Sequence, residues 1–323
     1  MNKLALASLM ILLGLAVPHL AEAVGDPFLT TMATRMAIMG MAVASLGFLV
    51  GFAGLVSFGH AAFFGIGAYV VAILFKHHSE ASPIPFLPFA WEGSLSGMVQ
   101  LPLAFIASFL FALLVGALSL RTRGVFFIMI TLAFAQMLYH FMISLPDYGG
   151  EDGLSIWERS QVPGLDLYND YDFYYLCFGL LVGVLLLLRM IIHSSFGVII
   201  RAASQDEARL ATLGVPVFRY RLLAFALAGG IAGLSGALAA NLYEFSGPGL
   251  MHWSRSGEML VMLILGGMGS LLGGVAGAIM FIGLEEILAG WTEHWALILG
   301  PILIMVVLFA HGGLMGFFSR GRS

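Results

Sequence analysis

The sequence predicts an all-α protein that crosses a membrane many times. The chain of 323 residues is 60% hydrophobic and 10% charged, whereas a soluble domain is about a quarter charged. Its apolar residues form continuous runs long enough to cross about 30 Å of hydrocarbon as helices. They do not alternate with polar residues, as they would in membrane strands. One aqueous core cannot bury so much apolar surface, so lipid is the expected solvent.

About ten runs are candidate membrane segments, and they include broken or re-entrant helices. The first, 4–20, follows Lys3 and precedes "AEA" at 21–23, so residues 1–23 are read either as a retained helix or as a cleaved signal peptide. The others are 30–50, 60–75, 98–120, 124–145, 172–190, 221–241, 257–272, 273–290 and 294–311. Two of them, 60–75 and 257–272, are short and adjoin glycine-rich stretches, which favours a break in each.

The distribution of charge predicts the orientation. Arginines cluster just after 98–120, within 189–221 and at the end of the chain, whereas 146–172 holds seven acids and one arginine. Because short cytoplasmic loops carry an excess of Lys and Arg, the arginine-rich regions are expected inside and 146–172 outside. Ten crossings satisfy every loop and place both termini in the cytoplasm, which favours the retained first helix. We therefore expect a single transmembrane domain, 1–323, with a cytoplasmic loop at 190–221.

One stretch in the apolar region stands out for its polar residues and glycines. "GLVSFGHAAFFGIG", 54–67, holds Ser57, His60 and four glycines, and 269–288 also runs from a glycine-rich bend into an apolar helix. Paired interrupted segments in two halves of a transporter indicate a substrate site near mid-membrane. Glycine-rich helices also pack closely for structural reasons alone, and His60 can simply bond freed backbone groups. Both interpretations stay open.

The cytoplasmic loop contains the signals of one short helix. Ser204 and Glu207 form a capping box that predicts a helix start near Gln205. Gly214 can close the helix in a left-handed conformation, and Pro216 prevents its continuation. A helix of about nine residues is marginal in water and must dock against something. Its small, low-profile surface suits a groove on a partner protein; packing against the chain's own membrane helices is the alternative.

The residues needed for catalysis or metal binding are missing. A phosphate-binding loop needs Gly-Lys-Ser/Thr, but Lys3 follows Asn2 and Lys76 follows Phe75. The single cysteine excludes a cysteine pair for zinc, and adjacent histidines in an open loop are typical of a solvated segment. The basic residues form no run for nucleic acid. Glu285 and Glu286, near the end of 273–290, either reach toward water or line a path. We therefore expect no enzyme, metal or cofactor site.

Four segments together resemble one family. They are "GGEDGLS" (149–155) and the segments 51–74, 201–240 and 259–288. In this order they resemble the LivM-type permease of bacterial branched-chain amino-acid ABC transporters, over residues 35–317. One departure is Arg209, which follows Glu207 and Ala208 where a second alanine is usual.

The resemblance implies a permease subunit of an ATP-driven importer for amino acids, branched-chain ones (Leu, Ile, Val) first, in the bacterial inner membrane. It implies three kinds of partner besides lipid: a second, LivH-like permease subunit, two cytoplasmic ATPase subunits that bind ATP and Mg, and a periplasmic substrate-binding protein. The residues expected to couple to the ATPase are Ser204, Glu207, Ala208, Ala211, Leu213 and Gly214. Those expected to line the path are Ser57, Gly59, His60, Gly266, Gly267 and Gly269.

Three alternatives remain beside this interpretation. Relatives in the same family carry urea, amides or aromatic acids. A channel or carrier that needs no ATPase belongs to a different class, although 31–50, 99–120 and 222–240 offer no carboxylate for proton coupling. A membrane-embedded enzyme is disfavoured by the missing catalytic residues.

Overall fold

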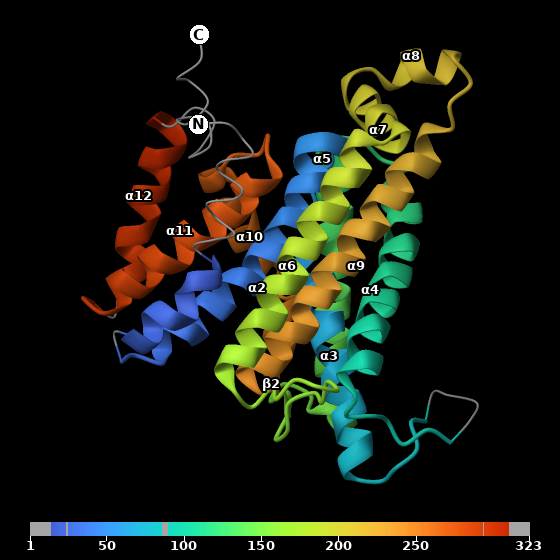
Figure 1. Cartoon of the computed structure of the whole chain (residues 1–323). Helices are drawn as coiled ribbons and strands as arrows, with labels where there is room; N and C mark the ends of the chain where they lie inside the picture. The colour runs from blue at the N-terminus through green and yellow to red at the C-terminus, as the bar shows by residue number, and fades with distance from the viewer. Residues whose placement is uncertain (1–13, 24, 86–89, 293, 310–323) are drawn as a thin grey trace. The chain divides into compact units, whose positions relative to one another are not determined.

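The computed structural model describes residues 14–23, 25–85, 90–292 and 294–309, and these are mostly helical (Figure 1). Besides the helical residues 14–23, the α-helices are α2 (Phe28–Phe48), α3 (His60–Ser79), α4 (Gly97–Ser119), α5 (Val125–Ile143), α6 (Asp170–His193), α7 (Ser195–Gln205), α8 (Glu207–Thr212), α9 (Val217–Tyr243), α10 (Trp253–Gly266), α11 (Leu271–Ala289) and α12 (Trp295–Phe309). Short elements are the π-helix η1 (Leu49–Ala53), the 3₁₀ turns η2 (Pro146–Tyr148) and η3 (Pro248–Met251), and an antiparallel pair of β1 (Leu154–Ser155) and β2 (Phe245–Ser246).

Seven helices in the described part of the chain are long and apolar enough to cross a membrane, which confirms an all-α, multi-pass protein. They are 28–53, 60–79, 97–119, 125–143, 170–193, 217–243 and 271–289. The expectation of a short helix at 60–75 is wrong, because α3 has 20 residues. The break expected in the segment 257–272 is confirmed, since α10 ends at Gly266 after 14 residues and α11 begins at Leu271.

The total of ten crossings and the location of the termini stay predictions. Residues 1–13 and 310–323 lie outside the described residues, and with them most of the expected first helix. The helix α12 has 15 described residues, fewer than a full span of about 20.

The chain folds as two compact units, each described here by itself. Unit 1 comprises 1–55, 178–217 and 257–323, and unit 2 comprises 56–177 and 218–256.

Glycines allow the helices of unit 1 to pack close together. A Cβ on Gly274 of α11 would lie 3.1 Å from Cα of Ala44 in α2. Within the α10–α11 hairpin, a Cβ on Gly266 would overlap the carbonyl oxygen of Gly273, and one on Gly277 would overlap that of Met262. Small residues at membrane helix contacts allow such an approach of backbones. The structural interpretation of the glycines therefore holds at this hairpin.

An ion pair also joins α2 and α11. Arg35 Nη2 donates to both carboxylate oxygens of Glu285, at 2.9 and 2.8 Å. The two side chains are only 27% and 19% exposed. Glu285 is thus held by a partner 250 residues away in sequence, a role that neither of the two expectations for it included.

Breaking this pair is expected to destabilise unit 1. Glu285→Ala leaves the Arg35 guanidinium without its carboxylate in an apolar setting, so the free energy of unfolding should fall by about 2 kcal/mol, less than for a fully buried pair. Thermal unfolding in detergent measures the loss. Glu286→Ala removes the same charge one residue further and serves as control, and the exchange Arg35→Glu with Glu285→Arg should recover part of the stability. Equal melting of Glu285→Ala and wild type would contradict the pair.

Unit 2 is organised around the contact between α3 and α9. A Cβ on Gly67 of α3 would overlap the carbonyl oxygen of Gly233, and one on Gly236 of α9 would overlap that of Phe64. Ser108 of α4 donates its hydroxyl to the carbonyl oxygen of Phe63 at 3.1 Å. Around this crossing lie edge-to-face aromatic rings, which pair Phe63 with Phe111 and Phe225, and Phe225 with Phe127.

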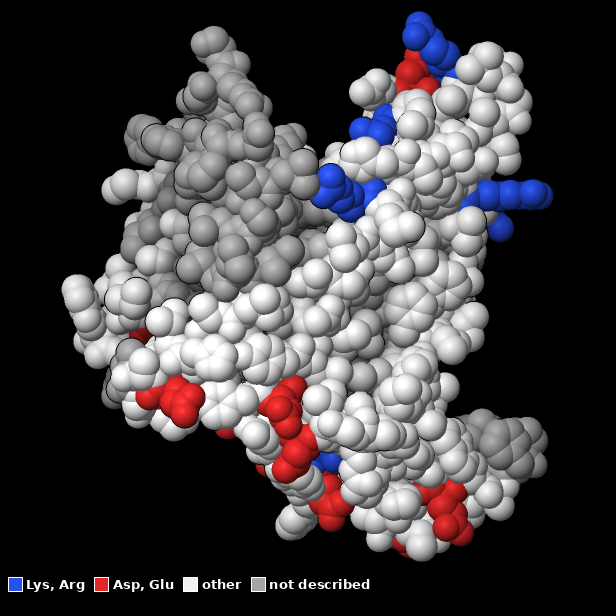
Figure 2. Space-filling model, in the orientation of Figure 1, with Lys and Arg blue, Asp and Glu red and all other residues white. Residues whose placement is uncertain are grey.

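Unit 2 has a basic end and an acidic end. The helix α9 begins beside Arg219 and Arg221, and its far end continues into β2, which pairs with β1 of the acidic segment 146–172. Twenty-seven helical residues separate these ends by about 40 Å, at 1.5 Å per residue. Figure 2 shows Lys and Arg side chains gathered at one end and Asp and Glu side chains at the other. This arrangement agrees with the charge pattern that predicted an external loop.

Candidate functional site

A break in the helix separates α2 from α3. After Phe48 the backbone widens into the π-helix η1, which ends at Gly54 with a left-handed φ of 67°. The chain then runs without helix until His60. A break of this kind leaves backbone N–H groups that hydrocarbon cannot satisfy.

Hydroxyl groups of side chains satisfy the N–H groups on the α3 side of the break. Ser57 Oγ accepts from Gly59 N at 3.1 Å, and Thr131 Oγ1 of α5 accepts from Phe58 N at 3.2 Å. Ser256 Oγ of α10 accepts from Ala61 N at 2.9 Å, and Ser256 is fully buried. Three elements of unit 2 therefore converge on the start of α3.

Removing one of these acceptors should cost stability. Ser256→Ala leaves the buried N–H of Ala61 without its hydrogen bond, so the free energy of unfolding should fall by about 1–2 kcal/mol. Thermal unfolding of the purified protein measures this loss, with Ser254→Ala as control because Ser254 is exposed. An unchanged melting temperature for Ser256→Ala would mean that the bond contributes nothing.

The three predicted path residues of this region all have structural contacts. Ser57 and His60 are fully buried, and the His60 ring lies edge-on to Phe63 with 6.0 Å between ring centres. A Cβ on Gly59 would lie 3.0 Å from the carbonyl oxygen of Thr131, so α5 passes close to this glycine.

The predicted path glycines of the α10–α11 turn differ from one another. Gly266 is a packing residue of the hairpin, Gly267 has a left-handed φ of 109°, and Gly269 is exposed with no atom within 4 Å of an added Cβ. Ser57, Gly59 and His60 belong to unit 2 and these glycines to unit 1. That the two groups line one path stays a prediction.

The start of the predicted cytoplasmic helix is wrong by a few residues. A helix that the sequence did not indicate, α7, runs through Ser204 to Gln205. Ser204 donates its hydroxyl to the carbonyl oxygen of Arg201 at 2.8 Å and caps nothing. The cap of α8 is Asp206, whose carboxylate accepts from Arg209 N at 3.0 Å. An aspartate in extended conformation competes better for this position than a serine already inside a helix.

The end of this helix is as predicted. Gly214 has a left-handed φ of 78°, and its N–H donates to the carbonyl oxygen of Ala211 at 3.0 Å. None of the six residues of α8 is buried, and Leu213 just after it is 73% exposed. The alternative that this helix packs against the chain's own membrane helices therefore has no support in the described contacts.

The adjoining helix α7 contacts the break instead. A Cβ on Gly54, where η1 ends, would lie 3.0 Å from Cβ of Ser204. A Cβ on Gly51 of η1 would overlap the carbonyl oxygen of Met268, in the turn between α10 and α11. Within unit 1, α7, the π-helix η1 and this turn thus form one chain of contacts. The density of glycines signalled close approaches here, but not their partners.

Comparisons with known proteins agree with the resemblance seen in the sequence. The family described as "branched-chain amino acid transport system / permease component" matches residues 28–308. Two relatives, from Salmonella typhimurium and Escherichia coli, are each named high-affinity branched-chain amino acid transport system permease protein LivM. Each is 26% identical over 97% of this chain and 75% of its own length. No solved structure matches the chain. Because the family match extends over most of its length, this chain belongs to the permease components of branched-chain amino acid transport systems.

Proposed function

We propose that this protein is a membrane permease subunit of an ATP-driven importer for branched-chain amino acids in the bacterial inner membrane. The family match along 28–308 carries the proposal, and the relatives named for such transport support the substrate class. The helix α8 supports the link to ATP, since none of its six residues is buried and a partner protein can reach it.

The partners follow from this role. Two cytoplasmic ATPase subunits bind ATP and Mg, a second permease subunit completes the path, and an external binding protein delivers the substrate. This chain, as one transmembrane domain with ten crossings and both termini inside, binds no cofactor itself. The arginine-rich end of unit 2 faces the cytoplasm, as the excess of basic residues in short cytoplasmic loops requires.

The contacts of unit 1 suggest how the motion of an ATPase reaches the membrane. A partner that grips α8 moves α7 with it, because only Asp206 separates the two helices. Ser204 lies close to Gly54, and Gly51 lies close to the turn at Met268. Displacing α7 therefore shifts the break before α3 and the α10–α11 turn together. Both segments belong to the proposed path, which alternates between outward-open and inward-open states.

Reconstitution of the transporter tests the proposal. Vesicles that contain both permease subunits, the two ATPases and the external binding protein should accumulate leucine only when ATP is present. Vesicles with the permease subunits alone should not. Transport at full rate without ATPases or nucleotide would overturn the proposal in favour of a channel or carrier.

A further inference from the structure

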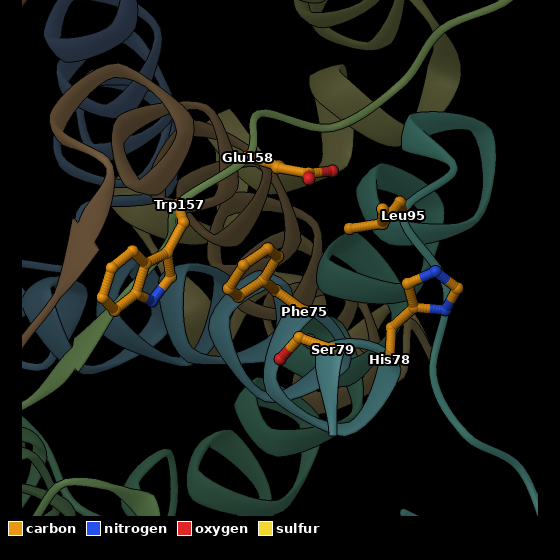
Figure 3. Close-up of a pocket in the computed structure, with 6 residues that line it drawn as sticks. All are labelled: Phe75, His78, Ser79, Leu95, Trp157 and Glu158. Atoms are coloured by element: carbon orange, nitrogen blue, oxygen red, sulfur yellow. The ribbon is translucent and has the colours of Figure 1, made fainter. Parts of the chain in front are cut away.

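A cavity opens at the acidic end of unit 2. It has a volume of about 570 Å³ and is lined by Phe75, His78, Ser79, Leu95, Trp157 and Glu158. Figure 3 shows the other five side chains placed around the ring of Phe75. Phe75 is 6% exposed and belongs to the hydrophobic core, whereas Trp157 is 81% exposed. The cavity therefore has an apolar floor and an aromatic and acidic rim.

The rim is held rigidly although it belongs to a loop. On one side of Trp157, Ile156 is buried and its N–H donates to the carbonyl oxygen of Glu244 at 2.8 Å. On the other side, Arg159 pairs with Asp170 at 3.0 Å and with Glu244 at 3.2 Å. These two anchors fix the backbone on both sides of Trp157, so a partner that covers its ring has little backbone to order.

Buried polar bonds anchor the next residue of the loop as well. Ser160 donates through N and Oγ to Asn241 Oδ1 of α9, at 2.7 and 2.8 Å, and its hydroxyl also contacts Gln100 of α4. Nearby, the hydroxyl oxygen of Tyr148 lies 3.2 Å from Nε2 of His77 and forms a hydrogen bond with it. Burial first, and then the carboxylate of Asp147, raise the pKa of Tyr148, so this phenol stays neutral. The loop is therefore a fixed platform.

The chemistry of the cavity selects a cation. Glu158 supplies a carboxylate, and Phe75 and Trp157 supply aromatic rings that attract a cation. The surrounding loop carries seven acids, and its one arginine is taken up by Asp170 and Glu244. Among the described residues no lysine or arginine lines the cavity, so the carboxylate of a free amino acid would find neither side chain there.

The same charges decide between kinds of partner. Anionic lipid headgroups are repelled by this acidic end, whereas a basic protein surface is attracted to it. An exposed tryptophan beside a carboxylate, on an anchored backbone, is typical of the centre of a protein interface, where Trp, Tyr and Arg dominate the binding energy.

We propose that this cavity is the docking point for the external binding protein, which inserts a lysine or arginine side chain between Trp157 and Glu158. The proposal rests on the importer function proposed above. It assigns the contact to one pocket of the external loop and predicts a basic patch on the partner.

Titration of the complete transporter in nanodiscs with its binding protein tests this assignment. Trp157→Ala should raise the dissociation constant about 30-fold, the equivalent of about 2 kcal/mol. Glu158→Gln should raise it less and flatten its dependence on salt, since salt screens exposed charges. The matched controls Tyr168→Ala and Glu151→Gln alter an exposed ring and an exposed acid of the same loop outside the cavity, and should leave binding unchanged.

Leucine uptake in the same preparations distinguishes failure of the docking proposal from failure of the importer proposal. At saturating binding protein, the Trp157 and Glu158 variants should still import leucine, because they weaken docking only. If the binding protein stimulates the wild type and binds both variants equally well, the cavity assignment fails and the importer stands. If it does not stimulate the wild type, the importer itself fails. If the variants lose binding of free leucine in the absence of binding protein, the cavity is a small-molecule site and the docking proposal is overturned.

Discussion

Gly67→Ala is expected to prevent unit 2 from folding as described. The added methyl group would overlap the carbonyl oxygen of Gly233, and its next nearest neighbours are also backbone atoms of Gly233, so no side chain can rotate away to relieve the clash. The helices α3 and α9 must then separate, and overpacking of a tight core costs about 1–3 kcal/mol or more. The expected results are a lower yield of folded protein and a lower melting temperature in detergent.

Two further variants make this result specific. Gly236→Ala meets the backbone of Phe64 from the other side of the same contact and should behave like Gly67→Ala. Gly183→Ala, in the middle of α6, meets no atom within 4 Å and should melt at or above the wild-type temperature, because alanine favours helix over glycine by about 1 kcal/mol. Wild-type stability of Gly67→Ala would show that α3 and α9 are further apart than described.

Changes in α8 are expected to separate ATP hydrolysis from uptake. Gly214 has a φ of 78°, which proline cannot adopt, and Gly214→Pro also removes the N–H that donates to Ala211 O. Ala211→Asp places a charge on an exposed position of the helix that the ATPase would cover, and burying it unpaired costs more than 1.4 kcal/mol, or about tenfold in affinity. Both variants should insert normally, hydrolyse ATP and lose most uptake.

Parallel measurements of ATP hydrolysis and leucine uptake in the same vesicles check this expectation. Gly25→Pro is the matched control, because Gly25 also has a positive φ of 75° and donates its N–H to the end of a helix, at Ala21 O. It should leave coupling intact. Normal uptake by both Gly214→Pro and Ala211→Asp would remove the case for α8 as the coupling element.

Features that depend on neighbouring residues were predictable from the sequence. Continuous apolar runs indicated the membrane helices, because length and composition alone decide whether a segment can cross hydrocarbon. Gly214 was correctly expected in the left-handed region, since a glycine before a proline at a helix end signals the stop by itself. The capping box failed because two possible caps, Ser204 and Asp206, are only two residues apart in the sequence, and the extent of α7 decided between them.

Features that depend on contacts between residues far apart in the sequence could not be predicted from the sequence alone. The N–H groups of the break are satisfied by Thr131 and Ser256, which lie 73 and 195 positions along the chain from their donors. The partner of Glu285 is Arg35, 250 positions away. Gly266 and Gly277 of the hairpin proved to be packing residues because each meets a backbone from another element.

The stretch 54–67 shows both sides of this division. By itself the sequence indicated a helix break in this stretch, and the structure has one at 54–59, whereas His60, Gly65 and Gly67 lie within α3. Only the tertiary structure decided what the break contacts. Gly54 lies against α7, and N–H groups at the start of α3 donate to hydroxyl groups of other elements. The physical reason is that hydrophobicity and backbone conformation are local properties, whereas satisfying a buried N–H requires whichever acceptor folding brings within 3 Å or so.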